Sequence, residues 1–459
     1  MPRTAILYVA ERCNQSCVFC LEEDASWRPF VDPSTEEVFA LLGRLRARGA
    51  EHITFMGGET FFRKDLGAVL TRAKAHGYTR VGVTTNGTVL SKPGFVRALA
   101  AAGLDFVEIS IHGHTEALAN AIGGAHFTFA RQRAALAELA QAGVPAIVNV
   151  VVCRENAALL RDVVGYVAEG FPALRARFKL KFVSLQGLAA ERAEAGDRPL
   201  HYEDVDFAAA GDDLERRDAP FWFYNAPLCR LGAHAARAHE VATLATDEAY
   251  FDFDHRDGAA YYDSGHQLEG RIWPERPCGG CALRPICPGI EASYARAHGP
   301  AATLGLAASA RDPLPLLEGA LRDRRLDASR ATARLAALAR APRPTRFVPP
   351  LEAGGVRFSH DAEEEPLDVR VEPRAQGVRC FAASARFALA YRPWSRGDAY
   401  ARPRVASLLR ALARAMNEAD RAGASLEGAR DALARAAVDG WIATRPHAAR
   451  ARRVSLPLA

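Results

Sequence analysis

The sequence predicts an α/β fold built on a parallel β-sheet, followed by a small cysteine-rich domain and an α+β region at the carboxyl end. Two patterns carry this prediction. Short apolar runs typical of strands alternate with longer runs of helical periodicity, and this alternation is typical of βαβ units. Most of the nine cysteines, in addition, gather near residues 13–20 and 278–287. Beyond residue 300 the alternation gives way to Arg/Ala/Leu-rich helical segments and then to further short strands.

Each predicted strand of the sheet ends in, or carries, polar or glycine-rich residues. The carboxyl ends of parallel strands meet at one edge of a barrel, where such folds build their active sites. The first run, 5–10, leads into the first cysteine group, and the later motifs are Gly57-Gly58-Glu59 after 52–56, Thr85-Asn86-Gly87 after 81–84, Ser110-Ile111-His112-Gly113 after 106–109, Asn149 within 146–152 and Leu185-Gln186-Gly187 after 180–184. The predicted helices are 35–47, 66–75, 93–102, 129–142 and 157–169.

The first cysteine group places Cys13, Cys17 and Cys20 at C-x3-C-x2-C spacing. Three thiolates this close can bind a soft metal or an iron–sulfur cluster. A [4Fe–4S] cluster normally takes four thiolates, so three leave one iron open. The alternative is three disulfide-bonded or structural cysteines, and the lack of a recognisable secretory signal disfavours it.

This spacing, together with the ordered strand-end motifs, resembles the radical S-adenosylmethionine (SAM) superfamily. The resemblance implies a partial (β/α)6, TIM-like barrel over residues 1–190. It also implies a [4Fe–4S] cluster on the three cysteines whose open iron chelates SAM. Reductive cleavage of SAM then yields methionine and a 5′-deoxyadenosyl radical that takes a hydrogen atom from the substrate.

The resemblance further implies a set of SAM contacts. The Gly-Gly-Glu turn is expected at the SAM amino group, because glycine lets backbone approach closely and Glu59 complements the positive charge. Many relatives have proline after this turn, whereas Thr60 stands here. Each residue also has an ordinary interpretation as a turn former, a polar strand end or a core aromatic. The expected cofactor-binding residues are Phe19, Gly57, Gly58, Glu59, Thr85, Asn86, Ser110 and Asn149.

The second cysteine group places Cys278, Cys281 and Cys287 at C-x2-C-x5-C spacing, with Cys229 upstream. Four thiolates suit either Zn²⁺ or a fully ligated [4Fe–4S] cluster. The run resembles the auxiliary-cluster extensions called SPASM and twitch domains, which implies a second [4Fe–4S] cluster here. A structural zinc ribbon is the alternative. The two cysteines left over, too few for a further cluster, are Cys153 and Cys380, and both are expected to be structural.

Composition bounds the remaining questions. With 459 residues, 49% of them hydrophobic, the chain should form more than one domain. No apolar run reaches the roughly 18 residues of a membrane span, so no membrane partner is expected. Cysteine-rich chains without a signal peptide belong in a reducing compartment, which predicts a cytoplasmic protein. A net charge of +5 is weak support for nucleic-acid binding, and none is expected.

The predicted organisation has four parts. Residues 1–190 form the core barrel, 191–300 a connecting segment with the auxiliary-cluster domain, 301–350 a helical linker and 351–459 an α+β accessory domain. Strands at 356–359, 367–371 and 378–391, followed by helices at 405–422 and 426–438 and a short closing strand, resemble weakly the winged-helix elements that recognise leader peptides.

Two enzyme classes follow from these expectations. The first is a radical SAM oxidoreductase or maturase acting on a peptide or protein, favoured by the large carboxyl-terminal region. The second acts on a small molecule such as an aminoglycoside, nucleotide or cofactor precursor. A metal-binding scaffold without chemistry is disfavoured by the intact cysteine triad and Gly-Gly-Glu motif. An electron donor of flavodoxin or ferredoxin type is expected as partner, and no catalytic acid or base can be assigned.

Overall fold

The chain divides into two compact units, Met1–Phe347 and Val348–Ala459. The computed structural model describes residues 3–20, 32–185, 189, 192–193, 196–246, 250–254, 258–262, 271–323, 326–340, 346–348, 356–360, 368–374, 377–383 and 387–391.

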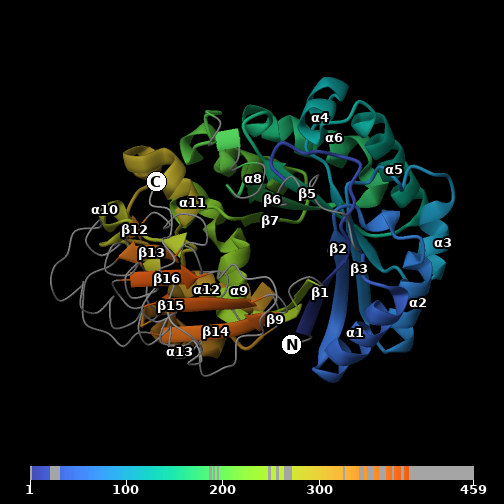
Figure 1. Cartoon of the computed structure of the whole chain (residues 1–459). Helices are drawn as coiled ribbons and strands as arrows, with labels where there is room; N and C mark the ends of the chain where they lie inside the picture. The colour runs from blue at the N-terminus through green and yellow to red at the C-terminus, as the bar shows by residue number, and fades with distance from the viewer. Residues whose placement is uncertain are drawn as a thin grey trace, which may run out of the picture. The chain divides into compact units, whose positions relative to one another are not determined.

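The first unit is built on a nine-stranded sheet in the order β7-β6-β5-β4-β3-β2-β1-β8-β9 (Figure 1). All neighbours from β7 to β8 run parallel, and only β9 is antiparallel, to β8. Consecutive strands from β1 to β7 lie side by side, as in an open barrel of βα units. The predicted partial barrel is therefore confirmed. The strands are β1 (Arg3–Ala10), β2 (Ala50–Gly57), β3 (Arg80–Thr85), β4 (Phe106–Ser110), β5 (Ala146–Val152), β6 (Arg177–Phe182), β7 (Phe221–Tyr224), β8 (Tyr250–Asp254) and β9 (Gly258–Tyr262).

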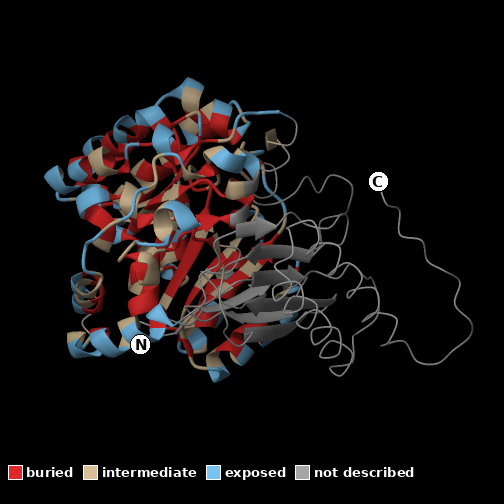
Figure 2. Cartoon of the chain, turned by 90° about the vertical axis from the view of Figure 1, so that its left-hand side faces the viewer, coloured by how far each residue is buried: buried red, intermediate tan, exposed pale blue. Residues whose placement is uncertain are grey.

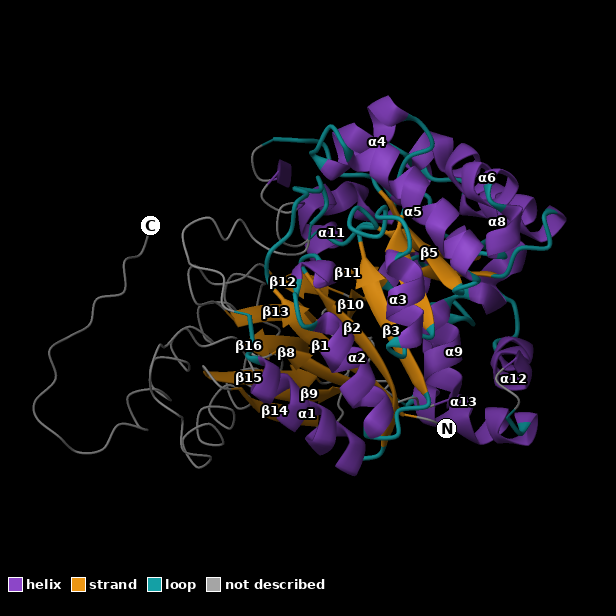
Figure 3. Ribbon diagram, turned by 90° about the vertical axis from the view of Figure 1, so that its right-hand side faces the viewer, coloured by secondary structure: helices purple, strands orange, loops and turns teal. Residues whose placement is uncertain are grey.

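Helices connect the parallel strands and cover the outer face of the sheet (Figure 3). Apolar residues of the strands and helices pack between the two layers, so the buried residues run along the strands (Figure 2). In β6, for example, Phe178, Leu180 and Phe182 are fully buried on this side. The barrel helices are α1 (Thr35–Ala47), α2 (Leu66–Ala75), α3 (Phe95–Ala101), α4 (Glu116–Gly123), α5 (Thr128–Ala142), α6 (Leu160–Gly170), α8 (Phe207–Arg216) and α9 (His239–Thr246).

Local sequence explains where the first helix begins. The Ser34 hydroxyl accepts a hydrogen bond from the backbone N–H of Glu37, and the Glu37 carboxylate accepts one from the backbone N–H of Ser34. This capping box satisfies two donors that the helix itself leaves free. Val38, Leu41, Leu42 and Leu45 then recur on the buried face.

The aromatic run 221–224, which falls in the segment 191–300 placed after the predicted barrel, forms the seventh strand of the sheet. Phe221 and Phe223 face the helical layer, where Phe223 packs against Phe207 of α8 at 5.6 Å between ring centroids. Trp222 and Tyr224 are half-buried on the opposite face. Four consecutive aromatics carry no alternation of polarity, and the strand is therefore hard to recognise from the sequence.

Residues 271–347 complete the first unit. The segment expected as a helical linker belongs to this compact unit, where α12 (Leu314–Asp323) packs on α9 and α13 (Ala331–Ala339) packs on α9 and on the turn 284–286. The other elements of this segment are β10 (Arg271–Ile272), α10 (Glu275–Cys278), β11 (Ile290–Glu291) and α11 (Ala292–His298). The strand β12 (Arg346–Val348) spans the boundary between the two units.

The second unit contains antiparallel strands in the order β13-β16-β15-β14. They are β13 (Val356–His360), β14 (Asp368–Arg374), β15 (Gly377–Ala383) and β16 (Phe387–Tyr391), so the predicted run 378–391 forms two strands. The helices predicted at 405–422 and 426–438 lie outside the described residues, and the winged-helix likeness stays a prediction. Within the described ranges, every helix is too short or too polar to cross a lipid bilayer.

Candidate functional site

The loop that carries the first three cysteines leaves the carboxyl end of β1 and is bound to the end of β2. The backbone N–H of Gly58 donates to the carbonyl of Ala10 at 2.8 Å, and that of Glu59 donates to the carbonyl of Arg12 at 2.6 Å. The parallel pairing of the two strands thus continues past the sheet, and it fixes the position from which the cysteine loop starts.

The two glycines of the Gly-Gly-Glu motif are required by this contact. A Cβ at Gly57 would lie 2.0 Å from the carbonyl oxygen of Ala10, and a Cβ at Gly58 would lie 2.4 Å and 2.5 Å from those of Glu11 and Arg12. Real Cβ atoms essentially never approach backbone this closely. We expected the missing side chains to admit a ligand. In the structure they admit the chain's own cysteine loop.

Residues at the end of α4 and at the start of α5 bind the other side of the loop. The backbone N–H groups of Ser16 and Val18 donate to the carbonyls of Gly123 and Ile122, each at 3.1 Å. The Gln15 amide donates to the hydroxyl of Thr128 at 3.0 Å. The loop is therefore bound on two sides by hydrogen bonds to elements of the barrel.

The Glu59 carboxylate points into the protein and is fully buried. One oxygen accepts from the backbone N–H of Phe61 (3.0 Å) and the hydroxyl of Thr85 (2.7 Å), and the other accepts from the backbone N–H of Asn86 (2.8 Å). Burial raises the pKa of Glu59, and these three hydrogen bonds oppose that rise. Glu59 was expected to face a ligand cation, but its side chain instead joins the end of β2 to the end of β3.

The side chains of Thr85 and Asn86 are also bound within the protein. The Thr85 hydroxyl donates to Glu59 and accepts from the backbone N–H of Gly87. The Asn86 amide bonds the hydroxyl and backbone of Thr88 and the side chain of Asn14, and it lies 3.6 Å from the sulfur of Cys13. Asn14, Gln15 and Thr88 were not among the predicted site residues, although the first two lie inside the cysteine motif.

The three thiols of the loop lie close enough to influence one another's ionisation. Burial raises the pKa of Cys17, and the charges of Cys13 and Cys20 raise it further. Burial also raises the pKa of Cys13, against hydrogen bonds from the backbone of Gln15 and the amide of Asn86. A cation placed among the thiols would lower their pKa, because it favours the thiolate form.

One side-chain oxygen of β5, beside Ser110 of β4, lacks a hydrogen-bond partner. Ser110 and Asn149 are paired across the two strands, and the buried side-chain oxygen of Asn149 has no hydrogen-bond partner. A buried acceptor without a partner is costly, so a ligand donor or a water molecule is expected there.

Phe19 packs at the same edge of the sheet, against His112 at 4.7 Å between ring centroids, edge to face. The Nδ1 atom of His112 accepts from the backbone N–H of Val151 at 3.1 Å. Burial lowers the pKa of His112 to about 3, so the imidazole is neutral at physiological pH.

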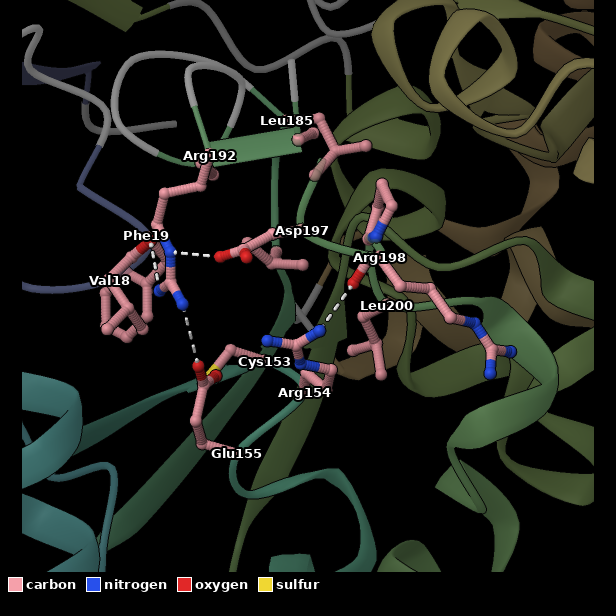
Figure 4. A pocket seen from close by; sticks show the side chains of 14 residues that line it. Val18, Phe19, Cys153, Arg154, Glu155, Leu185, Arg192, Asp197, Arg198 and Leu200 are labelled. Atoms are coloured by element: carbon pink, nitrogen blue, oxygen red, sulfur yellow. Dashed lines mark hydrogen bonds and ion pairs between the residues drawn. The ribbon is translucent and has the colours of Figure 1, made fainter. Parts of the chain in front are cut away.

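A pocket with about 380 Å³ of empty space, part of it open to solvent, lies beside Phe19 (Figure 4). Apolar side chains, including Phe19, Val183 and Leu185, form part of its wall, and Cys153 is buried in it. Arg192 spans the pocket and bonds Asp197 at 2.8 Å, Glu155 at 3.5 Å and the carbonyl of Val18 at 3.4 Å (Figure 4).

The second cysteine group comes together from distant parts of the chain. Burial, and then the negative charges of the neighbouring thiolates, Cys281 among them, raise the pKa of Cys229, Cys278 and Cys287, so the four sulfurs lie close together. For Cys287, burial is the largest cause, and the pKa rises to about 12. Cys229, the cysteine of this group most distant in sequence, lies in the turn that follows β7 and close to Cys281.

Backbone N–H groups surround these sulfurs. Gly289 donates to Cys287 at 3.4 Å, and Ser309 donates to Cys281 at 3.3 Å. Backbone bonds from Leu228 and Ala307 lower the pKa of Cys287 and Cys229 respectively, against burial. Such donors stabilise thiolates bound to a metal centre. Among the described residues, no group of three or more Cys, His, Asp or Glu residues already has the arrangement for a single metal ion.

A buried polar network joins the barrel to this second region. The hydroxyl of Ser184, after β6, bonds both carboxylate oxygens of Glu291 at 2.7 and 2.8 Å. Arg271 lies 3.8 Å from Glu291 and also bonds the side chain of Asn225, after β7. Lys181 of β6 lies near these charges, and burial lowers its pKa. The network connects the carboxyl ends of β6 and β7 to β10 and β11.

Fold and site define a class: an open parallel barrel with a three-thiol loop at the carboxyl end of its first strand. Residues 7–166 match the family model of the radical SAM superfamily. The chain therefore carries a radical SAM domain, as expected from the sequence, and the family implies SAM and a [4Fe–4S] cluster as cofactors.

The relatives match only part of this chain. The chain is 30% identical over 168 residues to a PqqA peptide cyclase of Gluconobacter oxydans, covering 37% of this chain and 46% of the relative. It is 34% identical over 110 residues to a GTP 3′,8-cyclase of Lactiplantibacillus plantarum, covering 23% and 32%. The matches thus span less than half the length of these relatives. Among solved structures, SuiB of Streptococcus suis bound to S-adenosylmethionine overlaps 63% of this chain and 74% of that one, at 14% identity and a TM-score of 0.43.

Proposed function

We propose that this protein is a radical SAM enzyme that acts on a peptide or protein substrate. The observation that carries the proposal is the bound cysteine loop at the carboxyl edge of the barrel, inside a segment that matches the superfamily. When bound, the cluster and SAM supply a 5′-deoxyadenosyl radical, formed with one electron from an external donor, that takes a hydrogen atom from the substrate.

The residues at the edge of the sheet divide into four groups in this proposal. Cys13, Cys17 and Cys20 hold the cluster. Phe19, Ser110 and Asn149 contact SAM, since the side-chain oxygen of Asn149 lacks a partner and Phe19 forms part of the apolar wall of a pocket that suits the adenine ring. Gly57 and Gly58 keep their backbone at the SAM amino group while their missing side chains admit the loop. Glu59, Thr85 and Asn86 support the loop from behind, because their side chains are bound within the protein.

We further propose that Cys229, Cys278, Cys281 and Cys287 hold a second, auxiliary [4Fe–4S] cluster in a domain of SPASM or twitch type. Four converging thiols with backbone donors on at least three of them support a closed metal centre. A zinc ion would use the same ligands, and metal analysis separates the two.

The peptide substrate is supported by the relatives whose names describe a peptide cyclase. A small-molecule substrate is the second candidate, favoured by the match to a GTP 3′,8-cyclase. The remaining parts of the proposal are a flavodoxin- or ferredoxin-type donor, a cytoplasmic location and the accessory role of residues 351–459.

Metal analysis of anaerobically reconstituted protein tests both cysteine groups. With Cys13, Cys17 and Cys20 changed to alanine, about four irons and four sulfides should remain on the second group. One zinc and no residual iron would instead make the second group a zinc ribbon. Cys229→Ala should reduce metal retention by that group, whereas Cys153→Ala, at a buried thiol outside both groups, should leave metal content unchanged.

Formation of 5′-deoxyadenosine tests the activity. The reconstituted protein with SAM and dithionite should release 5′-deoxyadenosine, and the triple alanine variant of the first group should not. Adding a precursor peptide encoded beside the gene should increase this release and change the mass of the peptide. A fully loaded protein that releases none would contradict the proposed function.

A further inference from the structure

The side chain of Asn86 has one possible orientation. One amide atom receives hydrogen bonds from the backbone N–H of Thr88 at 2.9 Å and from the Thr88 hydroxyl at 2.7 Å. A backbone N–H can only donate, so this atom is the carbonyl oxygen. The amide nitrogen must then face the opposite way, toward the cysteine loop.

On that side the nitrogen meets two acceptors. The side-chain oxygen of Asn14 lies at 2.9 Å and the sulfur of Cys13 at 3.6 Å. An amide carries two N–H donors, so each acceptor receives one. The backbone of Asn86 is equally engaged, because its N–H donates to the Glu59 carboxylate at 2.8 Å and its carbonyl accepts from Gln132 at 2.9 Å.

Every polar group of Asn86 is therefore hydrogen-bonded within the protein, and one amide N–H faces the sulfur of Cys13, a proposed cluster ligand. The other described contacts of the first cysteine group differ. The Cys17 thiol donates to the side-chain oxygen of Gln15 at 3.5 Å, and Gln15 is held in that orientation by Thr128. Of these two cysteines, Cys13 thus has a neutral side-chain donor and Cys17 faces an acceptor.

We propose that Asn86 is a positioning residue for the cluster, which orients Cys13 and raises the reduction potential of the cluster through an N–H···S hydrogen bond. Reduction adds negative charge to the cluster and its thiolates, and a donor at the sulfur stabilises the more negative state. Glu59, which holds the backbone of Asn86, sets the position of this donor. The inference rests on the assignment of the first cysteine group in the proposed function.

The test compares two buried asparagines. Asn86→Ala removes the donor, and Asn86→Asp replaces it with an acceptor while keeping the oxygen that Thr88 binds. Asn156→Ala is the matched control, because Asn156 is fully buried and bonded to Cys153, Val151 and His112 but touches no proposed cluster ligand. The readout is the midpoint potential from an EPR-monitored redox titration of the reconstituted full chain, followed on the reduced-cluster signal that changes when SAM is added.

We expect a more negative midpoint potential in Asn86→Ala, a larger shift in Asn86→Asp, which adds charge, and no shift in Asn156→Ala. If Asn86→Ala cannot hold four irons, Thr88→Val provides a milder change, since it removes one of the two bonds that orient the amide, and it should shift the potential in the same direction. Unchanged potentials in the loaded variants, or an equal shift in Asn156→Ala, would overturn the inference. A wild-type protein that takes up no cluster on the first group would refute the proposed function instead.

Discussion

A single methyl group at Gly58 should test the contact between the Gly-Gly-Glu motif and the cysteine loop. The added Cβ of Gly58→Ala would lie 2.4 Å from the carbonyl oxygen of Glu11 and 2.5 Å from that of Arg12, and both neighbours are backbone. No side chain can rotate away, so the strands must separate or the loop must move.

The magnitude follows from two costs. Forcing a methyl group into packed backbone costs about 1–3 kcal/mol. Displacement also weakens the hydrogen bonds from Gly58 to Ala10 and from Glu59 to Arg12, each contributing about 1 kcal/mol. We therefore expect the free energy of unfolding to fall by about 3 kcal/mol.

Gly67→Ala is the matched control. Gly67 lies in α2, and a Cβ there meets nothing within 4 Å. Alanine should raise the free energy of unfolding by about 0.5–1 kcal/mol because it favours the helix.

Urea denaturation of the iron-free chain, followed by circular dichroism, measures both effects. Gly67→Ala marks the transition of the first unit by moving it upward. With a slope of about 3 kcal/mol/M, Gly58→Ala should move the same transition down by about 1 M. Equal midpoints for the two variants would refute the steric argument, and Gly58→Ala should in addition retain less iron after reconstitution.

Three further results are expected. Glu59→Gln should lower the free energy of unfolding by about 1–3 kcal/mol, because one of three buried donors loses its acceptor. Burial raises the pKa of Glu59 in the folded protein above the ordinary value near 4.5, so its contribution to stability is largest below that pH and falls as the pH rises. Urea titrations should show this pH dependence in the wild type but not in the variant. His112→Asn should make the stability of the protein less sensitive to acid. Because the pKa of His112 is about 3 in the folded protein and 6.5 ordinarily, its titration favours unfolding as the pH falls from 6.5 toward 3. Melting temperatures that change with pH in the same way in both proteins would contradict this. Asn149→Ala should weaken SAM binding about tenfold in equilibrium dialysis, which corresponds to about 1.4 kcal/mol for one lost hydrogen bond, with iron content unchanged.

Much of the barrel could be predicted because local signals and tertiary packing agree there. The helices 35–47 and 66–75 have the predicted bounds, since apolar periodicity marks their buried faces and a capping box marks where the first begins. The motifs after the strands lie at one edge because parallel strands place them there.

The side-chain directions at this edge could not be predicted. A glutamate after Gly-Gly looks available to a ligand, yet donors from Phe61, Thr85 and Asn86 bind Glu59 inside the protein. Nothing in a single sequence indicates that these donors converge. The sequence likewise shows Asn14 and Gln15 only as residues between the motif cysteines, because their partners Thr88, after β3, and Thr128, on α5, are distant in the chain.

The hydrogen-bond partners of the two cysteine groups lie at different positions in the chain, so they are synthesised at different times. The described hydrogen-bond partners of the loop 13–20 lie no further along than Arg192, whereas the sulfurs of the second group receive donors from Ala307 and Ser309. During synthesis from the amino end, the first loop can be enclosed long before the last donor of the second group exists. We therefore expect the first site to become competent for metal loading on a shorter nascent chain, and the second only after the chain has passed residue 309.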